Sequence, residues 1–293
     1  MFCPLYSKSC CGLLAGATKA RISAHLALQG HLADVTAKES TQETAVALAG
    51  LLLGVVLAHF VGSDDNYTWL VFALLLLLHQ YSNYRLIRVL VFETLNTQRC
   101  FILTRKEIET IDRPEREDLP FPRPADIARD ESIFMPFYLT FLGPYIGCPI
   151  ADIFDGISVI HSEGEILESK RFPFVELLKL LNLWSKEEFI IGLDRKGRVS
   201  IALQQDCSER SILKAYLLGC FVHHRLKQKN IPLKAAYSAL INEYAMEAEL
   251  WFTKRGHDGI WSTKGDLGSW NVTDITANIH PSPWRYSTKQ KEQ

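Results

Sequence analysis

A continuous apolar stretch, residues 45–61, begins directly after a stretch of polar and small residues, 34–44. It limits the possible folds of this chain more than any other feature. The apolar stretch contains a single polar side chain, that of His59. A surface helix of a soluble domain keeps polar residues on one face, and this stretch keeps none. At about 1.5 Å per residue it would be roughly 26 Å long, close to the thickness of a bilayer core. It therefore predicts a membrane-spanning helix or a helix buried on every side.

A second apolar block, residues 67–78, follows a short acidic link. It is shorter than the ~17–25 residues of a spanning helix, so it needs the milder continuation through residue 92. Basic residues precede the first block and follow the second, and the positive-inside rule then gives a hairpin with both ends in the cytoplasm. We predict a membrane hairpin at about 43–84, with residues 45–61 facing outward as an apolar band. The alternative is a soluble protein with two fully buried core helices.

The composition then divides the chain into three regions. Residues 105–131 combine charge with prolines and lack an apolar period, which predicts a linker. Residues 1–104 form the expected membrane-associated region, and residues 132–293 form an expected cytoplasmic domain. The predicted fold class is a mostly α membrane-associated helical region followed by a small α+β domain.

Within residues 132–293, turn and capping signals predict individual elements. Two strands flank a glycine turn between residues 189 and 204. Ser208 is placed to cap a helix through about residue 227, and a second helix is expected from 233 to about 254. The tail containing Trp261, Trp270 and Trp284 is expected to return as one or two strands.

Charge, cysteines and motifs exclude several classes of function. The net charge of −1 and the absence of a basic run argue against a nucleic acid partner. The seven cysteines are scattered without metal-ligand spacing, and no secretory signal is present, so we expect reduced thiols at an intracellular membrane. No common nucleotide, hydrolase, kinase or zinc motif occurs. No catalytic residue, cofactor or metal is assigned, and an enzyme with an unfamiliar active site is the weakest alternative.

The polar stretch beside the apolar run has two interpretations. Ser40 and Glu43 have the spacing of a capping box, which would start a helix at the membrane boundary. Alternatively, Glu39 and Glu43 would share a face if the helix began earlier, and the polar residues would line a site. The full candidate polar site comprises Asp34, Lys38, Glu39, Gln42, Glu43, Asn83, Tyr84 and Arg85.

Glycines recur at the spacing that permits close helix approach. Gly12 and Gly16 form one such pair, and Gly50 and Gly54 form another. We predict helix packing at both pairs, with an ordinary contact in a soluble protein as the alternative for the first.

Two blocks of sequence resemble the root UVB sensitive family. Residues 15–52 contain ADVTAKESTQET followed by LAGLL, and residues 82–99 contain SNYRLIR followed by TLNTQR. The matching positions are Ala33, Asp34, Ala37, Lys38, Ser40, Gln42, Glu43, Thr44, Leu48, Ala49, Gly50, Leu51, Leu52, Asn83, Tyr84, Arg85, Arg88, Thr94, Leu95, Asn96 and Arg99. Two long matches in the family's order are more specific than any short motif in the chain.

The resemblance implies a membrane protein without established catalytic activity. Plant members of the family are linked to ultraviolet B responses, auxin transport and vitamin B6 homeostasis, and they act as pairs of family members. A family region that precedes these blocks has no counterpart here, so we expect a member truncated at its N-terminus. The leading hypothesis is association with the bilayer and with family members, and the alternative is a transporter or small-molecule carrier that uses the polar site.

Overall fold

A computed structural model describes residues 3–27, 31–61, 65–113, 115, 119–133, 143–154, 174–231, 233–261, 270 and 285–286. The chain divides into two compact units, Met1–Ile87 and Arg88–Gln293. We call them the N-terminal unit and the C-terminal unit.

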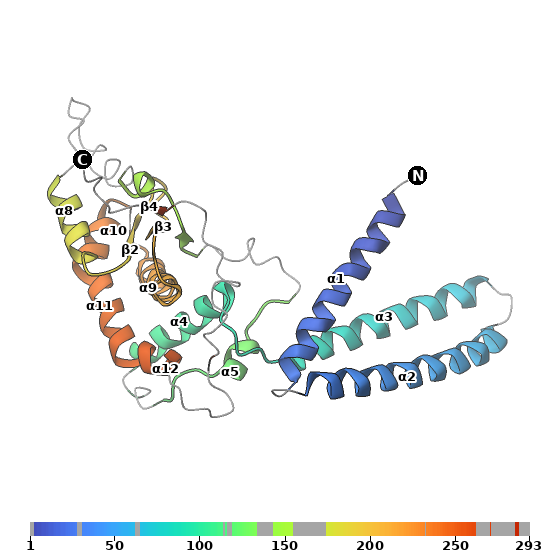
Figure 1. Cartoon of the computed structure of the whole chain (residues 1–293). Helices are drawn as coiled ribbons and strands as arrows, with labels where there is room; N and C mark the ends of the chain where they lie inside the picture. Colours follow the sequence, from blue (N-terminus) through green and yellow to red (C-terminus); the bar gives the residue numbers. More distant parts are fainter. Residues whose placement is uncertain are drawn as a thin grey trace, which may run out of the picture. The chain divides into compact units, whose positions relative to one another are not determined.

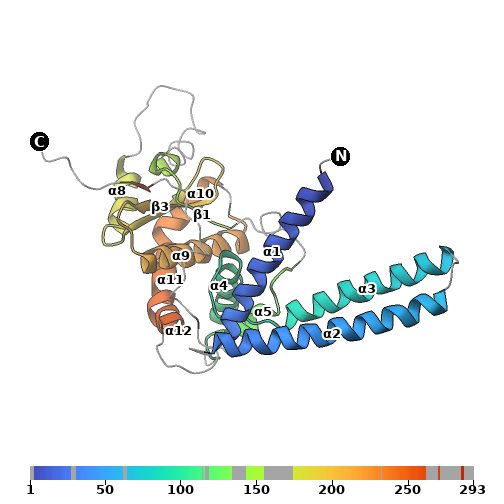
Figure 2. The same cartoon turned by 45° about the vertical axis from the view of Figure 1, so that its right-hand side comes forward.

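Three long helices make up the N-terminal unit: α1 (Cys3–Leu26), α2 (Leu32–Val61) and α3 (Asp65–Val89). Helices α2 and α3 run side by side in both views as the two arms of a hairpin (Figures 1 and 2). The 30 residues of α2 correspond to about 45 Å of helix. The predicted hairpin is therefore present, and α2 extends well before the apolar run.

The two arms of the hairpin expose their apolar side chains. Every residue from 41 to 60 is exposed, as are nearly all residues from 66 to 89. Both arms are long and apolar enough to cross a membrane, and neither buries any part of its apolar window. The predicted outward-facing band is thus confirmed. The alternative of two buried core helices is wrong, because these helices bury none of their apolar windows.

The spaced glycines of this unit face open space. A Cβ atom built at Gly12, Gly16, Gly50 or Gly54 would meet no heavy atom within 4 Å. They do not mediate close helix packing among the described residues. Packing of these glycines against another chain stays a prediction.

The C-terminal unit begins earlier than the predicted domain did. Helices α4 (Thr97–Ile111) and α5 (Pro124–Ala128) occupy much of the stretch that we expected to be a linker, and the unit boundary lies at residue 88 rather than 104. Charged residues in α4 conceal an apolar stripe of Cys100, Leu103 and Ile108, all buried. Their helical spacing supplies the core face of α4.

A small sheet lies within the C-terminal unit. Its strands are β1 (Tyr145–Ile146), β2 (Phe189–Leu193), β3 (Val199–Gln204) and β4 (Arg285–Tyr286). Strands β2 and β3 pair antiparallel with Phe189 opposite Leu203, and β1 and β4 pair parallel with β3. Gly197 has a φ of 72° in the turn, a conformation that favours glycine. The predicted hairpin is confirmed.

The remaining helices surround this sheet. They are α8 (Phe174–Leu183), α9 (Glu209–Gln228), α10 (Leu233–Ala239), the π-helical segment η2 (Leu240–Tyr244), α11 (Ala245–Trp251), the π-helical segment η3 (Phe252–Gly256) and α12 (His257–Trp261). Ser208 caps α9 by accepting a hydrogen bond from the Ser211 amide, as predicted. Helix α9 is the centre of the core, with Leu213, Leu217 and Phe221 fully buried.

The end of the chain differs in part from the prediction. The second predicted helix continues to Trp261, so this residue ends a helix and does not begin a strand. Trp270 is buried and donates its indole N–H to the carbonyl of Pro122 at 3.0 Å. Trp284 lies outside the described residues. The predicted fold class holds as a mostly helical chain with a small sheet in its second part.

Candidate functional site

A polar cluster joins α1 to α2 in the N-terminal unit. Lys19 Nζ lies 2.6 Å from Glu43 Oε2 and 3.5 Å from Glu39 Oε1. Ser23, which is buried, donates its hydroxyl to Glu39 Oε2 at 2.9 Å. Because α2 begins at Leu32, the two glutamates lie one turn apart on the same face, as the second interpretation of the stretch required.

In this cluster one amine, that of Lys19, lies near two carboxyl groups, those of Glu39 and Glu43. The hydrogen bond from Lys19 to Glu43 raises the pKa of the Lys19 amine. Lys19 therefore stays protonated at neutral pH and holds α1 against α2 at this level. Lys19 and Ser23 were not predicted as members of the site, because nothing in the sequence indicates which residues of α1 meet α2.

The predicted capping box is not formed. Ser40 lies inside α2, and its carbonyl accepts a hydrogen bond from the Thr44 hydroxyl at 2.9 Å. Glu43 turns to Lys19 and not back to the amide of Ser40. The helix began earlier than the capping spacing indicated, because the polar residues from 34 to 44 are themselves helical.

The other candidate residues of the polar stretch lie on another face of α2 than Glu39 and Glu43. Asp34 lies 3.4 Å from the ring of His31. Lys38 and Gln42 are exposed, and neither has a hydrogen bond or ion pair with a residue that the structure describes. Positions 34, 38 and 42 share one helical face about a third of a turn from the face of Glu39 and Glu43. Lys38 and Gln42 therefore have no structural task within the described residues.

The candidate residues of α3 lie at the corresponding level of the other arm. Asn83 and Glu43 are both about 27 Å from the turn end of their helices at 1.5 Å per residue. Asn83 contacts His79 at 3.1 Å, and Arg85 donates to the Tyr81 hydroxyl at 3.3 Å. The hairpin thus brings the candidate residues of α2 and those of α3 to one level. The contacts of Asn83 and Arg85 lie within α3 itself.

A second polar assembly, in the core of the C-terminal unit, was not predicted. The carboxylate of Glu107, on α4, is 1% exposed and accepts two hydrogen bonds from Arg255, at 2.8 and 3.0 Å. The Trp251 indole also donates to it at 3.1 Å. A buried carboxylate needs such partners, because an unpaired one would be strongly destabilising. This arrangement fastens η3 to α4.

A buried arginine connects the same elements at a second point. Arg225, on α9, pairs with Asp112 at 2.6 Å and with Glu247. Its guanidinium group also lies over the Phe221 ring at 5.5 Å from the centroid. The end of α4, the last turn of α9 and helix α11 are therefore joined through one cation.

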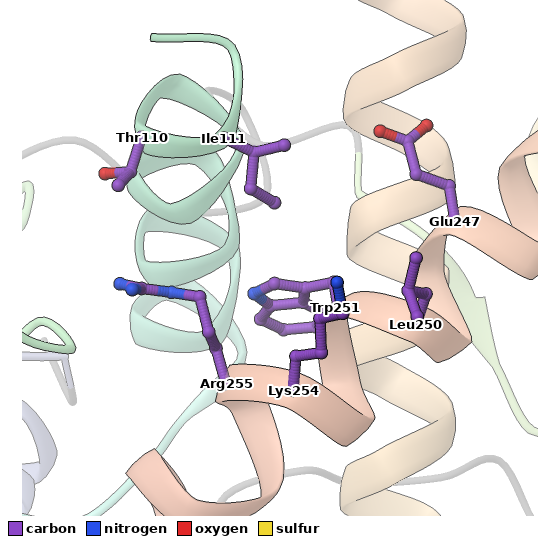
Figure 3. Close-up of a pocket in the computed structure, with 7 residues that line it drawn as sticks. All are labelled: Thr110, Ile111, Glu247, Leu250, Trp251, Lys254 and Arg255. Carbon is purple, nitrogen blue, oxygen red and sulfur yellow. The ribbon is translucent and has the colours of Figure 1, made fainter. Parts of the chain in front are cut away.

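A small pocket lies between these two buried assemblies. It has a volume of about 210 Å³, below the ~300–1,000 Å³ typical of small-molecule sites. Figure 3 shows its walls on α4, α11 and η3, formed by Thr110, Ile111, Glu247, Leu250, Trp251, Lys254 and Arg255. The charges of Glu247 and Arg255 are already paired, and the Thr110 hydroxyl donates to the carbonyl of Lys106. The walls contain no activated nucleophile.

The adjacent histidines of α9, His223 and His224, are packing residues. His224 contacts the carbonyl of Phe101 at 3.0 Å through Nε2, and the Phe101 ring lies 4.0 Å from its ring centroid. Burial lowers the pKa of His223 and that of His224 to about 4. Among the described residues, no group of three or more histidine, cysteine or acidic side chains is arranged to hold a metal.

The second sequence block performs a structural task at the start of the C-terminal unit. Asn96 caps α4 by accepting from the Arg99 amide at 2.8 Å. Arg99 is buried, donates to the carbonyl of Thr94 at 2.7 Å and pairs with Glu131 at 2.9 Å. Arg88 donates to the carbonyl of Glu131 at 3.3 Å. These contacts give Thr94, Asn96 and Arg99 a structural role at the start of the C-terminal unit.

Two family models cover most of the chain. A model described as the vitamin B6 photo-protection and homoeostasis domain matches residues 2–110, and one described as root UVB sensitive protein, C-terminal, matches residues 122–257. The chain belongs to the root UVB sensitive family. The polar cluster of α1 and α2 lies within the first matched region, and so do Asn96 and Arg99 at the start of α4.

Root UVB sensitive proteins of plants and of an amoeba are among the similar sequences. Protein root UVB sensitive 3 of Arabidopsis thaliana is 28% identical over 95% of this chain and 57% of its own length. RUS family member 1 of Dictyostelium discoideum is 33% identical over 51% of this chain and 27% of its own length. The chain thus spans about half or less of the curated relatives it matches. No solved structure matches it significantly.

Proposed function

We propose that this root UVB sensitive family member is an integral protein of an intracellular membrane that acts through association and not through catalysis. The α2–α3 hairpin inserts into the bilayer, and the C-terminal unit lies in the cytoplasm. Its partners are copies of itself, other family members or other proteins. Its processes are stress responses, hormone transport or vitamin B6 homeostasis, the last of which the matched family model names.

The exposed apolar band of the hairpin carries this proposal. Leaving a large apolar side chain in water forfeits roughly 1.5–3 kcal/mol relative to burial. Soluble monomers rarely expose contiguous apolar patches larger than a few hundred Å². Here both helices expose such side chains along their length, including Leu52, Val55, Leu74 and Leu77. A bilayer removes this cost, and helices satisfy their own backbone hydrogen bonds within it.

Aromatic residues bracket the apolar part of α3 and support the same placement. Tyr67 and Trp69 lie near the turn, and Tyr81 and Tyr84 lie near the other end. Tyr67 and Tyr84 are about 26 Å apart along the helix axis, close to the thickness of a hydrocarbon core. Tyrosine and tryptophan are enriched at the two membrane surfaces.

A charge substitution in the hairpin tests the proposal. Leu52→Arg places a cation in the centre of the band, at an expected cost of about 2.5–3.5 kcal/mol for membrane insertion. Leu250→Arg, at a comparably exposed leucine of the C-terminal unit, is the matched control. We expect carbonate to extract the Leu52→Arg chain from cell membranes, while the parent and the control stay in the pellet. A soluble parent chain would contradict the proposal.

One observation supports the alternative function, that of a carrier. Lys38 and Gln42 match the family block and have no structural partner among the described residues. A carrier predicts that Lys38→Ala abolishes uptake of labelled pyridoxine into membrane vesicles while insertion stays intact. Thr41→Ala, on the same exposed stretch, is the control. Absence of uptake by the parent chain would remove the carrier from consideration, and unchanged uptake in Lys38→Ala would remove Lys38 from the carrier's site.

A further inference from the structure

Helix α1 carries two adjacent exposed thiols, Cys10 and Cys11. The other cysteines with described side chains, Cys100, Cys148, Cys207 and Cys220, are all buried. Next to the exposed pair, Leu13 is 77% exposed and Leu14 is 67% exposed. An apolar patch with two accessible thiols is thus present on a helix whose own unit leaves it uncovered.

The patch lies on the side of α1 that faces away from α2. Successive residues of an α-helix are rotated by about 100°, so Cys10, Leu13 and Leu14 share one face. Lys19 is half a turn around the helix from Cys10, and Ser23 is close to Lys19 in angle. Since Lys19 and Ser23 contact α2, Cys10 and the two leucines lie on the opposite face, and Cys11 lies at its edge, about 100° from Cys10.

The contacts of α1 also fix its level along α2. Lys19 meets Glu43 and Ser23 meets Glu39, immediately before the apolar run at 45–61. In the proposed topology this level is the cytoplasmic surface of the membrane. Because Lys19 meets Glu43 and Ser23 meets Glu39, α1 runs antiparallel to α2 at this contact. Cys10, about 14 Å from Lys19 along the axis of α1, therefore lies on the side of this level where the apolar run begins.

We propose that Cys10 and Cys11 are S-acylated by long-chain acyl-CoA and that Leu13 and Leu14 enter the membrane surface beside them. This inference builds on the proposed membrane hairpin. In each transfer the cysteine sulfur attacks the acyl carbonyl carbon, and the bond between that carbon and the CoA sulfur breaks. The CoA thiolate leaves and takes up the proton that the cysteine released, so one thioester replaces another.

Two neighbouring acylation sites would provide the membrane affinity that stable anchoring requires. A single acyl chain gives only marginal, reversible membrane binding, whereas two chains hold a segment stably. The buried thiols are unsuited to the same reaction because they are enclosed. Burial also raises the pKa values of Cys100, Cys148 and Cys220. They serve as internal controls within the same chain.

Acyl exchange on the full chain in cell membranes tests the inference. Free thiols are blocked, hydroxylamine cleaves thioesters, and a maleimide mass tag marks each thiol released. We expect a shift by two tags in the parent, by one in Cys10→Ser or Cys11→Ser, and a complete loss of the shift in the double variant. Leu13→Gln with Leu14→Gln keeps both thiols and should lower the tagged fraction.

The results separate this inference from the proposed hairpin, because carbonate extraction is measured on the same samples. A chain that resists carbonate but carries no hydroxylamine-sensitive tag overturns S-acylation alone. Tags that persist in the Cys10→Ser, Cys11→Ser variant also overturn it. A chain that carbonate extracts and that carries no tag overturns both proposals. Equal tagging of the leucine variant and the parent would overturn the role of the apolar patch.

Discussion

The two units of this chain treat apolar and charged side chains in opposite ways. The N-terminal unit leaves Leu52 and Leu77 more than 60% exposed, while the C-terminal unit buries Leu213 and Leu217 completely. The N-terminal unit keeps its main ion pair, Lys19–Glu43, at the surface, and the C-terminal unit encloses Glu107 in its core. The two units are therefore suited to different surroundings, since water favours the burial of apolar side chains and only the C-terminal unit buries them.

Among single substitutions, the largest expected effect comes from removing the buried charge of the C-terminal unit. Glu107→Gln leaves Arg255 without its counter-charge and should cost about 3–5 kcal/mol of unfolding free energy. Glu109→Gln, at an exposed pair on the same helix, should cost at most about 1 kcal/mol. Urea unfolding of the detergent-solubilised chain, followed by tryptophan fluorescence, measures both. Equal midpoints for the two variants would show that burial of Glu107 does not distinguish this unit.

Acid should weaken the C-terminal unit through its buried histidines. The folded chain keeps His223 and His224 neutral down to about pH 4, whereas the unfolded chain protonates them near the ordinary value of 6.5. The unfolded state therefore binds more protons between these values, so unfolding free energy is fully present above about pH 7 and falls as the pH drops to 4. The loss should be on the order of 2–3 kcal/mol for each histidine.

Replacement of both histidines checks the origin of this pH dependence. His223→Phe with His224→Gln should flatten the urea midpoint between pH 7 and 4, while His257→Gln, at an exposed histidine of the same unit, should leave the slope intact. A slope that survives in the double variant would assign the acid sensitivity to other groups.

Matched glycine substitutions compare the packing of the two units. A Cβ atom at Gly219 of α9 would lie 2.7 Å from Ile201 Cδ1, whereas one at Gly50 would meet nothing within 4 Å. Gly219→Val should therefore cost about 1–3 kcal/mol through overpacking. Gly50→Val should not destabilise the chain, although it should weaken any association through that face, measured by cross-linking in membranes. A destabilising Gly50→Val would mean that this face is packed within the chain.

The smallest effect is expected at the exposed ion pair of the N-terminal unit. Lys19→Met should loosen the contact between α1 and α2 and raise hydrogen exchange of the amides near residue 19. Because the pair is exposed, salt screens it, and the variant should still insert into membranes. The urea midpoint of the C-terminal unit should not move. A loss of insertion would give the polar cluster a larger role than helix contact.

Local signals in the sequence were sufficient for several elements. The apolar run at 45–61 predicted a helix without a buried face, and the strands around Gly197 and the helix after Ser208 formed as expected. In each case the cause lies within a few residues: a hydrophobic pattern, a turn residue or a cap. The capping spacing of Ser40 and Glu43 failed because helix propensity and contacts with α1 started the helix earlier.

The candidate site was predicted only in part, for a related reason. Glu39 and Glu43 were assigned to one face from helical geometry, but their partners Lys19 and Ser23 were not identified. The second half of α4, from residue 105, falls in the predicted linker because its charged residues mask the stripe that packs on α9. Which charged residues of such a helix turn inward depends on partners that the local sequence does not contain.

By itself the sequence determined the family, the apolar hairpin, the strand pair and the main helix of the second unit. The contact of Glu107 with Arg255, 148 residues away, and that of Lys19 with Glu43 are visible only in the folded chain. The physical reason is that backbone preference and hydrophobic periodicity act over neighbouring residues. The pairing of buried charges is fixed only when distant elements pack and exclude water from between them.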